Sequence, residues 1–348
     1  MANRLYNTFE YDTDASENSI REPQYYIKDH IIVVSSADRD WINRTDENVW
    51  NFNVRLGGKG VNNQYSMVQN DMHNVISVGI DKLIMTNRAL NITYSNTVAD
   101  MSTYPYLLVG VENIAGNLNG TNKTIDNAIG IMTPNNGILT KSDSECNFIE
   151  FGNTSALAKE FYNQPIAKLS GLNITINNPL GSVPSPIDDV LNIKSITYLP
   201  AVASNLATEY LVVQSVDYFH PEQYKVGDII KFGDYVYRDT GVYAECSDFN
   251  TFINRDNGHR VIAVSTSDST KTLWNRLYIP TPNSASVSTG NVSAETWFDD
   301  LKTKSMDDIT TASSVTDSGK LLNYSMQTHM VYKVRSKQKM ESFLEDLV

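Results

Sequence analysis

Short runs in which apolar and polar residues alternate are the feature that most constrains how this chain can fold. In NFNVRL, residues 51–56, every second side chain is apolar, and LNITIN, residues 172–177, repeats the pattern. A period of two places the apolar side chains on one face of an extended strand, so each run predicts an antiparallel strand with one buried face.

Runs of this kind recur along most of the chain, and they are separated by Asn, Gly, Asp, Ser and Pro rather than by helical patterns. This spacing favours a sandwich or barrel over a βαβ fold. At 348 residues the chain is also longer than one hydrophobic core usually serves, which predicts two domains. The strands predicted for a first block lie at 30–36, 49–58, 74–86, 104–114, 147–152 and 169–178.

The Pro- and Gly-rich stretch 177–189 is the best domain boundary, because a second set of strand patterns follows it. Asn257-Gly258 is a hairpin-type turn signal within that set, so we expect a smaller β-barrel or sandwich of five or six strands. The strands predicted for this second block lie at 191–199, 209–219, 226–237, 259–265 and 275–280.

Outside the strand patterns, two segments have helical spacing, 155–161 and 294–306, the first behind the cap candidate Ser155. The polar start of the chain has no sustained period. The domains predicted are an extended N-terminal arm at 1–27, a β-domain at 28–182, a second β-domain at 188–283 and a polar segment with a tail at 284–348.

The charge of the chain argues against binding to a nucleic-acid backbone. Its net charge is −12, whereas such binding depends on Lys and Arg neutralising phosphates. No stretch approaches the roughly 20 apolar residues of a membrane-spanning helix, and no secretory signal opens the chain. We therefore expect Cys146 and Cys246 to be reduced, ordinary thiols.

Residues for catalysis or metal binding do not gather in the sequence, so we predict no catalytic, cofactor or metal site. No P-loop, G-x-S-x-G or G-x-G-x-x-G motif is present, and LGGKG at 56–60 indicates a turn or bulge. Asn-rich loops, such as the one at 117–127, are either binding surfaces or solvated loops. The five histidines, at positions 30, 73, 220, 259 and 329, lie singly and match no metal-ligand spacing.

The most suggestive charged cluster is Asp38, Arg39 and Asp40. Two carboxylates two residues apart could serve acid–base chemistry or hold a hard cation, but Arg39 lies between them and no further acid follows at ligand spacing. We expect instead that the cluster caps a turn after the 30–36 strand and that Trp41 packs over it.

Several stretches give the chain a resemblance to a known family. Residues 35–58, SSADRDWINRTDENVWNFNVRLGG, place a strand before a D-R-D/aromatic turn and an N-x-F-x-V strand. Residues 76–88, 104–122, 149–153 and 162–181 continue the likeness. In these stretches, about half of the chain, the sequence resembles the minor capsid proteins of large icosahedral (nucleocytoplasmic large) DNA viruses of algae and protists. The resemblance implies a jelly-roll-type β-sandwich that sits beneath or between major capsid oligomers and cements them.

The function that this resemblance implies is structural and non-enzymatic. The expected partners are the major capsid protein and other minor capsid proteins, and the expected location is the virion shell, assembled in the host cytoplasm. One alternative is a carbohydrate-binding or host-attachment module, which would need an exposed aromatic platform at Trp41, Trp50, Trp274 or Trp297. A second is a hydrolase built from scattered acids such as Asp38 and Glu150.

The segment 326–335 is predicted to complete the first β-domain. Block 28–182 supplies six or seven strands, one or two fewer than an eight-stranded jelly roll has. Met330, Tyr332 and Val334 alternate with a mostly cationic set, which is typical of an outer strand with one buried face. We therefore expect this segment to return to the first sheet, which makes the second β-domain an insertion.

Overall fold

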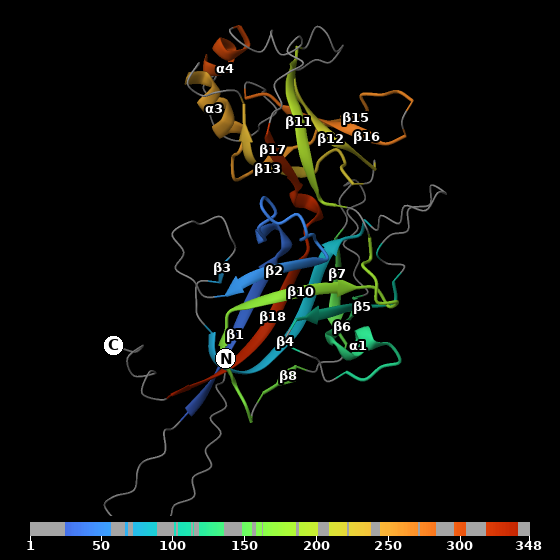
Figure 1. The fold of residues 1–348 in the computed structure, drawn as a ribbon, viewed down its shortest axis with the longest axis vertical. Coiled ribbons are helices and arrows are strands. Elements are labelled where there is room, and N and C mark those ends of the chain that lie inside the picture. Colours follow the sequence, from blue (N-terminus) through green and yellow to red (C-terminus); the bar gives the residue numbers. More distant parts are fainter. Residues whose placement is uncertain are drawn as a thin grey trace, which may run out of the picture.

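The chain folds into two curled, mainly antiparallel β-sheets that lie one beyond the other along the long axis (Figure 1). This architecture confirms the all-β prediction. The computed structural model describes residues 25–339 except for 57–66, 69–71, 89–100, 102–103, 113, 115–117, 136–147, 155–157, 162, 186–187, 201–208, 221–222, 238–243, 271, 283–295 and 304–317.

The first sheet has eleven strands, nine of them in the order β1-β18-β4-β7-β6-β5-β10-β2-β3, while β8 and β9 also pair with β4. All pairs are antiparallel except β2 with β3. The strands are β1 Tyr25–Ser35, β2 Asn51–Leu56, β3 Met67–Val68, β4 Met72–Thr86, β5 Leu107–Val111, β6 Ala128–Pro134, β7 Phe148–Asn153, β8 Lys159–Glu160, β9 Ile166–Leu169, β10 Gly171–Asn177 and β18 His329–Lys339.

The second sheet has seven strands in the order β14-β13-β17-β11-β12-β16-β15, and helices α3 and α4 pack beside it. Its strands are β11 Val190–Leu199, β12 Tyr210–Phe219, β13 Ile229–Val236, β14 His259–Arg260, β15 Ala263–Ser265, β16 Trp274–Pro280 and β17 Ser318–Asn323. The helices of the described chain are α1 Lys123–Asp126, α3 Ala244–Ile253, α4 Thr296–Leu301, η1 Ser36–Asp38 and η5 Tyr324–Met326.

Each sheet encloses its own cluster of buried apolar side chains, as the alternating runs require. Phe52 in β2 and Ile174 in β10 are fully buried in the first cluster. Phe232 in β13 and Phe249 in α3 belong to the second. The two clusters share no residue, so the region between the sheets has to be held by other contacts.

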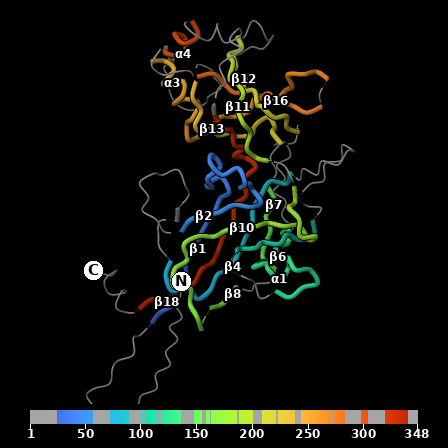
Figure 2. Tube along the Cα trace, viewed as in Figure 1, coloured from blue at the N-terminus to red at the C-terminus, as the bar shows by residue number. Residues whose placement is uncertain are grey.

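The pairing predicted for 326–335 is confirmed, but its position at the sheet edge is wrong. β18 pairs with β4 on one side and with β1 on the other, so it is an interior strand and β1 is the outer one. Figure 2 follows β1 and β18 side by side along the first sheet. Met330, Tyr332 and Val334 are buried, as the alternation predicts. The predicted domain boundaries themselves stay predictions.

Three predictions of local structure differ from the fold. The predicted helix at 155–161 is wrong in its second half, because Lys159–Glu160 forms β8 against β4. The predicted arm at 1–27 ends too late, since Tyr25–Ile27 already belong to β1, and residues 1–24 lie outside the described residues. Helix α3 was not predicted. The helix predicted at 294–306 corresponds to the shorter α4.

Candidate functional site

Two regions depart from the usual distribution of side chains, in which apolar groups are buried and charged groups are exposed. One is a buried polar junction between the sheets, and the other is an exposed apolar strand at the edge of the first sheet. The junction begins where β1 ends. Ser35 caps the short helix η1 by accepting a hydrogen bond from the Ala37 N–H, and Asp40 accepts one from the Asn43 N–H. The predicted turn capping is therefore confirmed for Asp40, whereas Asp38 is exposed.

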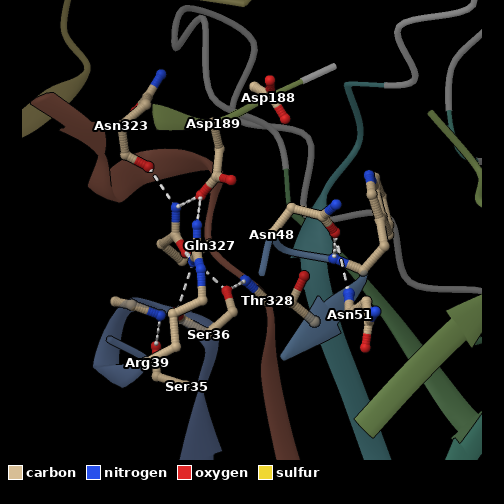
Figure 3. A network of polar contacts seen from close by, with 12 residues as sticks. Ser35, Ser36, Arg39, Asn48, Asn51, Asp188, Asp189, Asn323, Gln327 and Thr328 are labelled. Carbon is tan, nitrogen blue, oxygen red and sulfur yellow. Dashed lines mark hydrogen bonds and ion pairs between the residues drawn. The ribbon is translucent and has the colours of Figure 1, made fainter. Parts of the chain in front are cut away.

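Arg39, between the two acids, is buried and points into the junction (Figure 3). Its Nη2 donates to Asp189 Oδ2 at 2.6 Å, and Nη1 donates to the Ser36 carbonyl oxygen at 2.6 Å and to Gln327 Oε1 at 3.0 Å. Gln327 Nε2 also donates to Asp189 Oδ2, at 2.8 Å. The guanidinium therefore joins the end of β1, the start of β11 and the segment before β18.

A second buried ion pair crosses the same junction. Arg88, just after β4, donates through Nη1 and Nη2 to the two carboxylate oxygens of Asp228, both at 2.7 Å. Asp228 also accepts from the Lys225 backbone N–H at 2.9 Å. A two-pronged arginine–carboxylate pair fixes orientation as well as distance. This pair holds the first sheet to the loop that precedes β13.

Asn323, at the end of β17, connects the two ion pairs into one network. Its carbonyl oxygen accepts from Gln327 Nε2 at 2.7 Å, and its Nδ2 donates to Asp228 Oδ2 at 2.9 Å. Removing charges from water costs several kcal/mol per ion unless they are paired and hydrogen-bonded. Here the charges have partners from the opposite sheet, so the network couples the position of one sheet to the other.

Around the rim of the junction, an apolar contact and a hydrogen bond from one lysine also join the two sheets. A Cβ at Gly233 in β13 would lie 2.6 Å from Trp41 Cη2, so the indole packs directly on the backbone of the second sheet. Lys320 Nζ donates to the Ile42 carbonyl oxygen at 2.5 Å. Trp41 was expected to pack over its own turn, but it reaches the other sheet instead.

The remaining candidate residues do not converge on one site. Glu150 accepts hydrogen bonds from Lys82 and Asn135, which lower the pKa of its carboxyl. Asp38 lies elsewhere, at the end of η1 after β1. His259 is buried and its Nε2 lies 3.0 Å from the Phe252 and Ile253 carbonyl oxygens; burial lowers its pKa to about 3. Cys246 is buried, whereas Cys146 and the glycines at 57, 58 and 60 lie outside the described residues.

Among the described residues, no group of three His, Cys, Asp or Glu could hold a metal ion, and no helix is long and apolar enough to cross a membrane. The four tryptophans do not form an exposed platform. Trp50 is buried, Trp41 packs on Gly233, and Trp274 and Trp297 are half-buried against the second core. Sugar binding, which requires such a platform, therefore lacks its expected feature at these positions.

The second unusual region is the outward face of β1. Ile32 and Val34 point into the core, whereas Ile31 and Val33, which alternate with them, are 70% and 67% exposed. Tyr25 and Ile27 continue this exposed row toward the start of the strand. β1 is also the outer strand of its sheet, so its backbone on one side has no partner among the described strands. A long apolar edge of this kind is a template for a further strand.

Sequence reasoning singled out the strand at 30–36 but not the exposure of half of its apolar residues. In a continuous apolar run such as HIIVVSS, period two gives no polar face, so the pattern cannot show which side faces solvent.

Comparison with protein-family models, curated protein sequences and solved structures returned no match for this chain.

Proposed function

We propose that the chain is a structural, non-enzymatic minor capsid protein that cements major capsid oligomers in an icosahedral virion. The observation that carries the proposal is the open edge of β1. An eleven-residue outer strand with Ile31 and Val33 exposed leaves both backbone groups and apolar surface for another protein to cover. Its partners would be the major capsid protein and other minor capsid proteins, within the virion shell.

The junction supports the same proposal because a cement protein has to transmit force between its neighbours. Two β-domains joined only by flexible linkers would move independently, whereas here two buried arginines and Asn323 tie the sheets together. The buried charged groups of the junction already form ion pairs and hydrogen bonds between the sheets. They are therefore poor candidates for the groups of an active site, which must reach a substrate.

The proposal is tested by incorporation into particles. An epitope-tagged chain is expressed during infection, and purified virions are examined by immunoblotting and by immunogold labelling. The wild-type chain should be found in the shell, and Ile31→Lys with Val33→Lys should reduce its incorporation. Leu180→Lys is the matched control, because Leu180 is also exposed but lies far from β1 in the sequence and outside that strand. Absence of the wild-type chain from virions would refute the proposal.

A further inference from the structure

The outward face of β1 and β18 carries two rows of exposed side chains. Ile31 of β1 lies opposite Lys333 of β18, and Ile27 lies opposite Lys337. Directly opposite residues of an antiparallel pair point to the same face, so the two rows lie side by side. We call the exposed apolar side chains of β1 the apolar row: Tyr25, Ile27, Ile31 and Val33. We call three exposed side chains of β18 the cationic row: Lys333, Arg335 and Lys337.

The two rows form a strip that is two strands wide. On one side it ends at the free edge of β1, with which no described strand pairs. On the other side, Gly79 of β4 lies opposite Lys333 but is buried. A Cβ at Gly79 would lie 2.9 Å from the Ala158 Cβ, so Ala158 packs directly on β4 there. Strands lie about 4.8 Å apart, so two strands with their side chains are roughly as wide as one α-helix, about 10–12 Å.

The cationic row can accept carboxylates from a partner, although the chain as a whole carries a net charge of −12. Lys333 Nζ lies 2.8 Å from Asp81 Oδ1, and Arg335 Nε lies 3.2 Å from Asp29 Oδ1. Solvent reaches both pairs, and exposed ion pairs are weak and easily exchanged. Lys337 makes no ion pair with any described residue. β18 itself contains no acidic residue.

A partner that covers both rows has to lie on the face of the sheet rather than at its edge. A strand added to the free edge would be separated from β18 by β1. An extended segment on the face would meet side chains only, so its own backbone groups would lack partners. A helix pairs its backbone internally. Acids at positions i, i+4 and i+8 of a helix span about 12 Å, close to the roughly 13 Å between Lys333 and Lys337 along a strand.

An anionic membrane is the other kind of partner that a basic and apolar surface attracts. The strip is poorly suited to it, because Asp29 lies between Ile27 and Ile31 in the apolar row and its side chain is 77% exposed. Asp81 adds a second carboxylate beside Lys333. Acidic headgroups would repel both. A helix can place uncharged residues against them, so the charges of the strip favour a protein segment over a lipid surface.

We propose that the strip binds an amphipathic acidic α-helix of a neighbouring protein, which lies along β1 and β18. Its apolar side covers the apolar row, and acids spaced four residues apart pair with the cationic row. The inference deepens the proposed function, on which it rests, because it states the chemistry by which the chain recognises a neighbour in the shell.

A synthetic helical peptide tests the proposal on the full chain. The fluorescein-labelled probe has roughly 18 residues, which span about 27 Å, close to the length of the apolar row. It carries Glu at every fourth position along one side, Leu along the adjacent side and Ala elsewhere. Fluorescence anisotropy at low salt should show saturable binding to wild type. A probe with Gln in place of every Glu should bind at least roughly tenfold more weakly, because it offers no carboxylate.

Variants of the chain locate the binding. Reversal of the cationic row should weaken binding of the Glu probe at least roughly tenfold: Lys333→Glu, Arg335→Glu, Lys337→Glu. Ile31→Ser with Val33→Ser should weaken it by a similar factor, because apolar burial is lost. The matched control reverses three exposed cations on other strands and should bind like wild type: Arg55→Glu, Lys168→Glu, Lys194→Glu. Thermal melting checks that each variant folds.

Four outcomes would overturn the proposal. Wild type could fail to bind the Glu probe, or bind the Gln probe equally well. The control triple could lose as much binding as reversal of the cationic row, which would show that only overall charge matters. Wild type could also bind phosphatidylserine vesicles but not the probe, which would identify a lipid surface as the partner. Virion incorporation is measured separately, so incorporation without probe binding would refute this inference and leave the proposed function standing.

Discussion

The junction and the outer strand β1 depart from the rule of apolar inside and charged outside in opposite directions. At the junction, Arg39 and Arg88 are buried, and each is matched by a carboxylate from the other sheet. On β1, Ile31 and Val33 are exposed, and the described residues offer nothing that covers them. Paired buried charge fixes the internal geometry of a protein, whereas uncovered apolar surface indicates a partner. The two regions therefore differ in role: the junction holds the fold together, whereas the exposed row of β1 is surface that a partner could cover.

The largest expected effect comes from removing the strands that link the two regions. A chain that ends at Pro282 lacks β17 and β18, which are interior strands of the second and first sheets. Because each sheet loses buried apolar contacts and leaves two neighbouring strands unpaired, the loss should exceed the 5–15 kcal/mol by which domains are typically stable. Circular dichroism should show no cooperative unfolding. A chain that ends at Lys339 is the control, and an unchanged melting transition for the shorter chain would contradict the interior role of β18.

The next largest effect should come from breaking one junction pair. Arg39→Met leaves Asp189 buried without its cation, and Arg88→Met does the same to Asp228, so each should destabilise the fold by about 3–5 kcal/mol. Chemical denaturation measures the change. Arg335→Met is the matched control, because Arg335 pairs with Asp29 at the surface and should contribute less than about 1 kcal/mol. Equal losses in the free energy of unfolding at all three arginines would show that the junction pairs contribute no more than a surface pair does.

Acid should weaken the second sheet through a buried group outside both regions. Burial lowers the pKa of His259 to about 3, from an ordinary value of 6.5. The unfolded chain therefore binds a proton that the folded chain does not, and stability falls as the pH drops from 6.5 toward 3, by roughly 1 kcal/mol per pH unit. Denaturation at several pH values should show a shallower fall for His259→Asn than for wild type.

A smaller effect is expected at the rim of the junction. Gly233→Ala would place a Cβ 2.6 Å from Trp41 Cη2 and 2.7 Å from Ile42 Cδ1, so both side chains would have to move. Overpacking of this kind costs about 1–3 kcal/mol. If Trp41 is the obstacle, Trp41→Leu combined with Gly233→Ala should lose less than the two single changes add up to. Strict additivity in thermal denaturation would contradict the contact.

The sequence allowed the strands to be predicted better than the junction, for a physical reason. Alternation in 326–335 predicts a strand with Met330, Tyr332 and Val334 inside because period two is a local property. The interior position of that strand could not be predicted, because it depends on β1 pairing with its other edge. Arg39 and Asp189 are 150 residues apart, and no local pattern reports such a contact. The helix predicted at 155–161 was wrong at Lys159–Glu160, because tertiary pairing with β4 overrides the local spacing there.

The smallest expected effect on stability is the one that most directly tests the meaning of the outer strand. Ile31 and Ile32 are neighbours of identical chemistry, but Ile31 is 70% exposed and Ile32 is 2% exposed. Ile32→Ala should cost about 2–5 kcal/mol, since it leaves a cavity in the first core.

Ile31→Ala should change the free energy of unfolding by less than about 0.5 kcal/mol, yet under the proposed function it should weaken incorporation into particles. Denaturation of the two variants measures the first effect, and virion incorporation measures the second. A residue that is apolar because folding requires it would instead show a large loss of stability and little change in incorporation. If Ile31→Ala destabilised the protein as much as Ile32→Ala, the exposed row would be required for folding, and the contrast between the paired junction and the open edge of β1 would not hold.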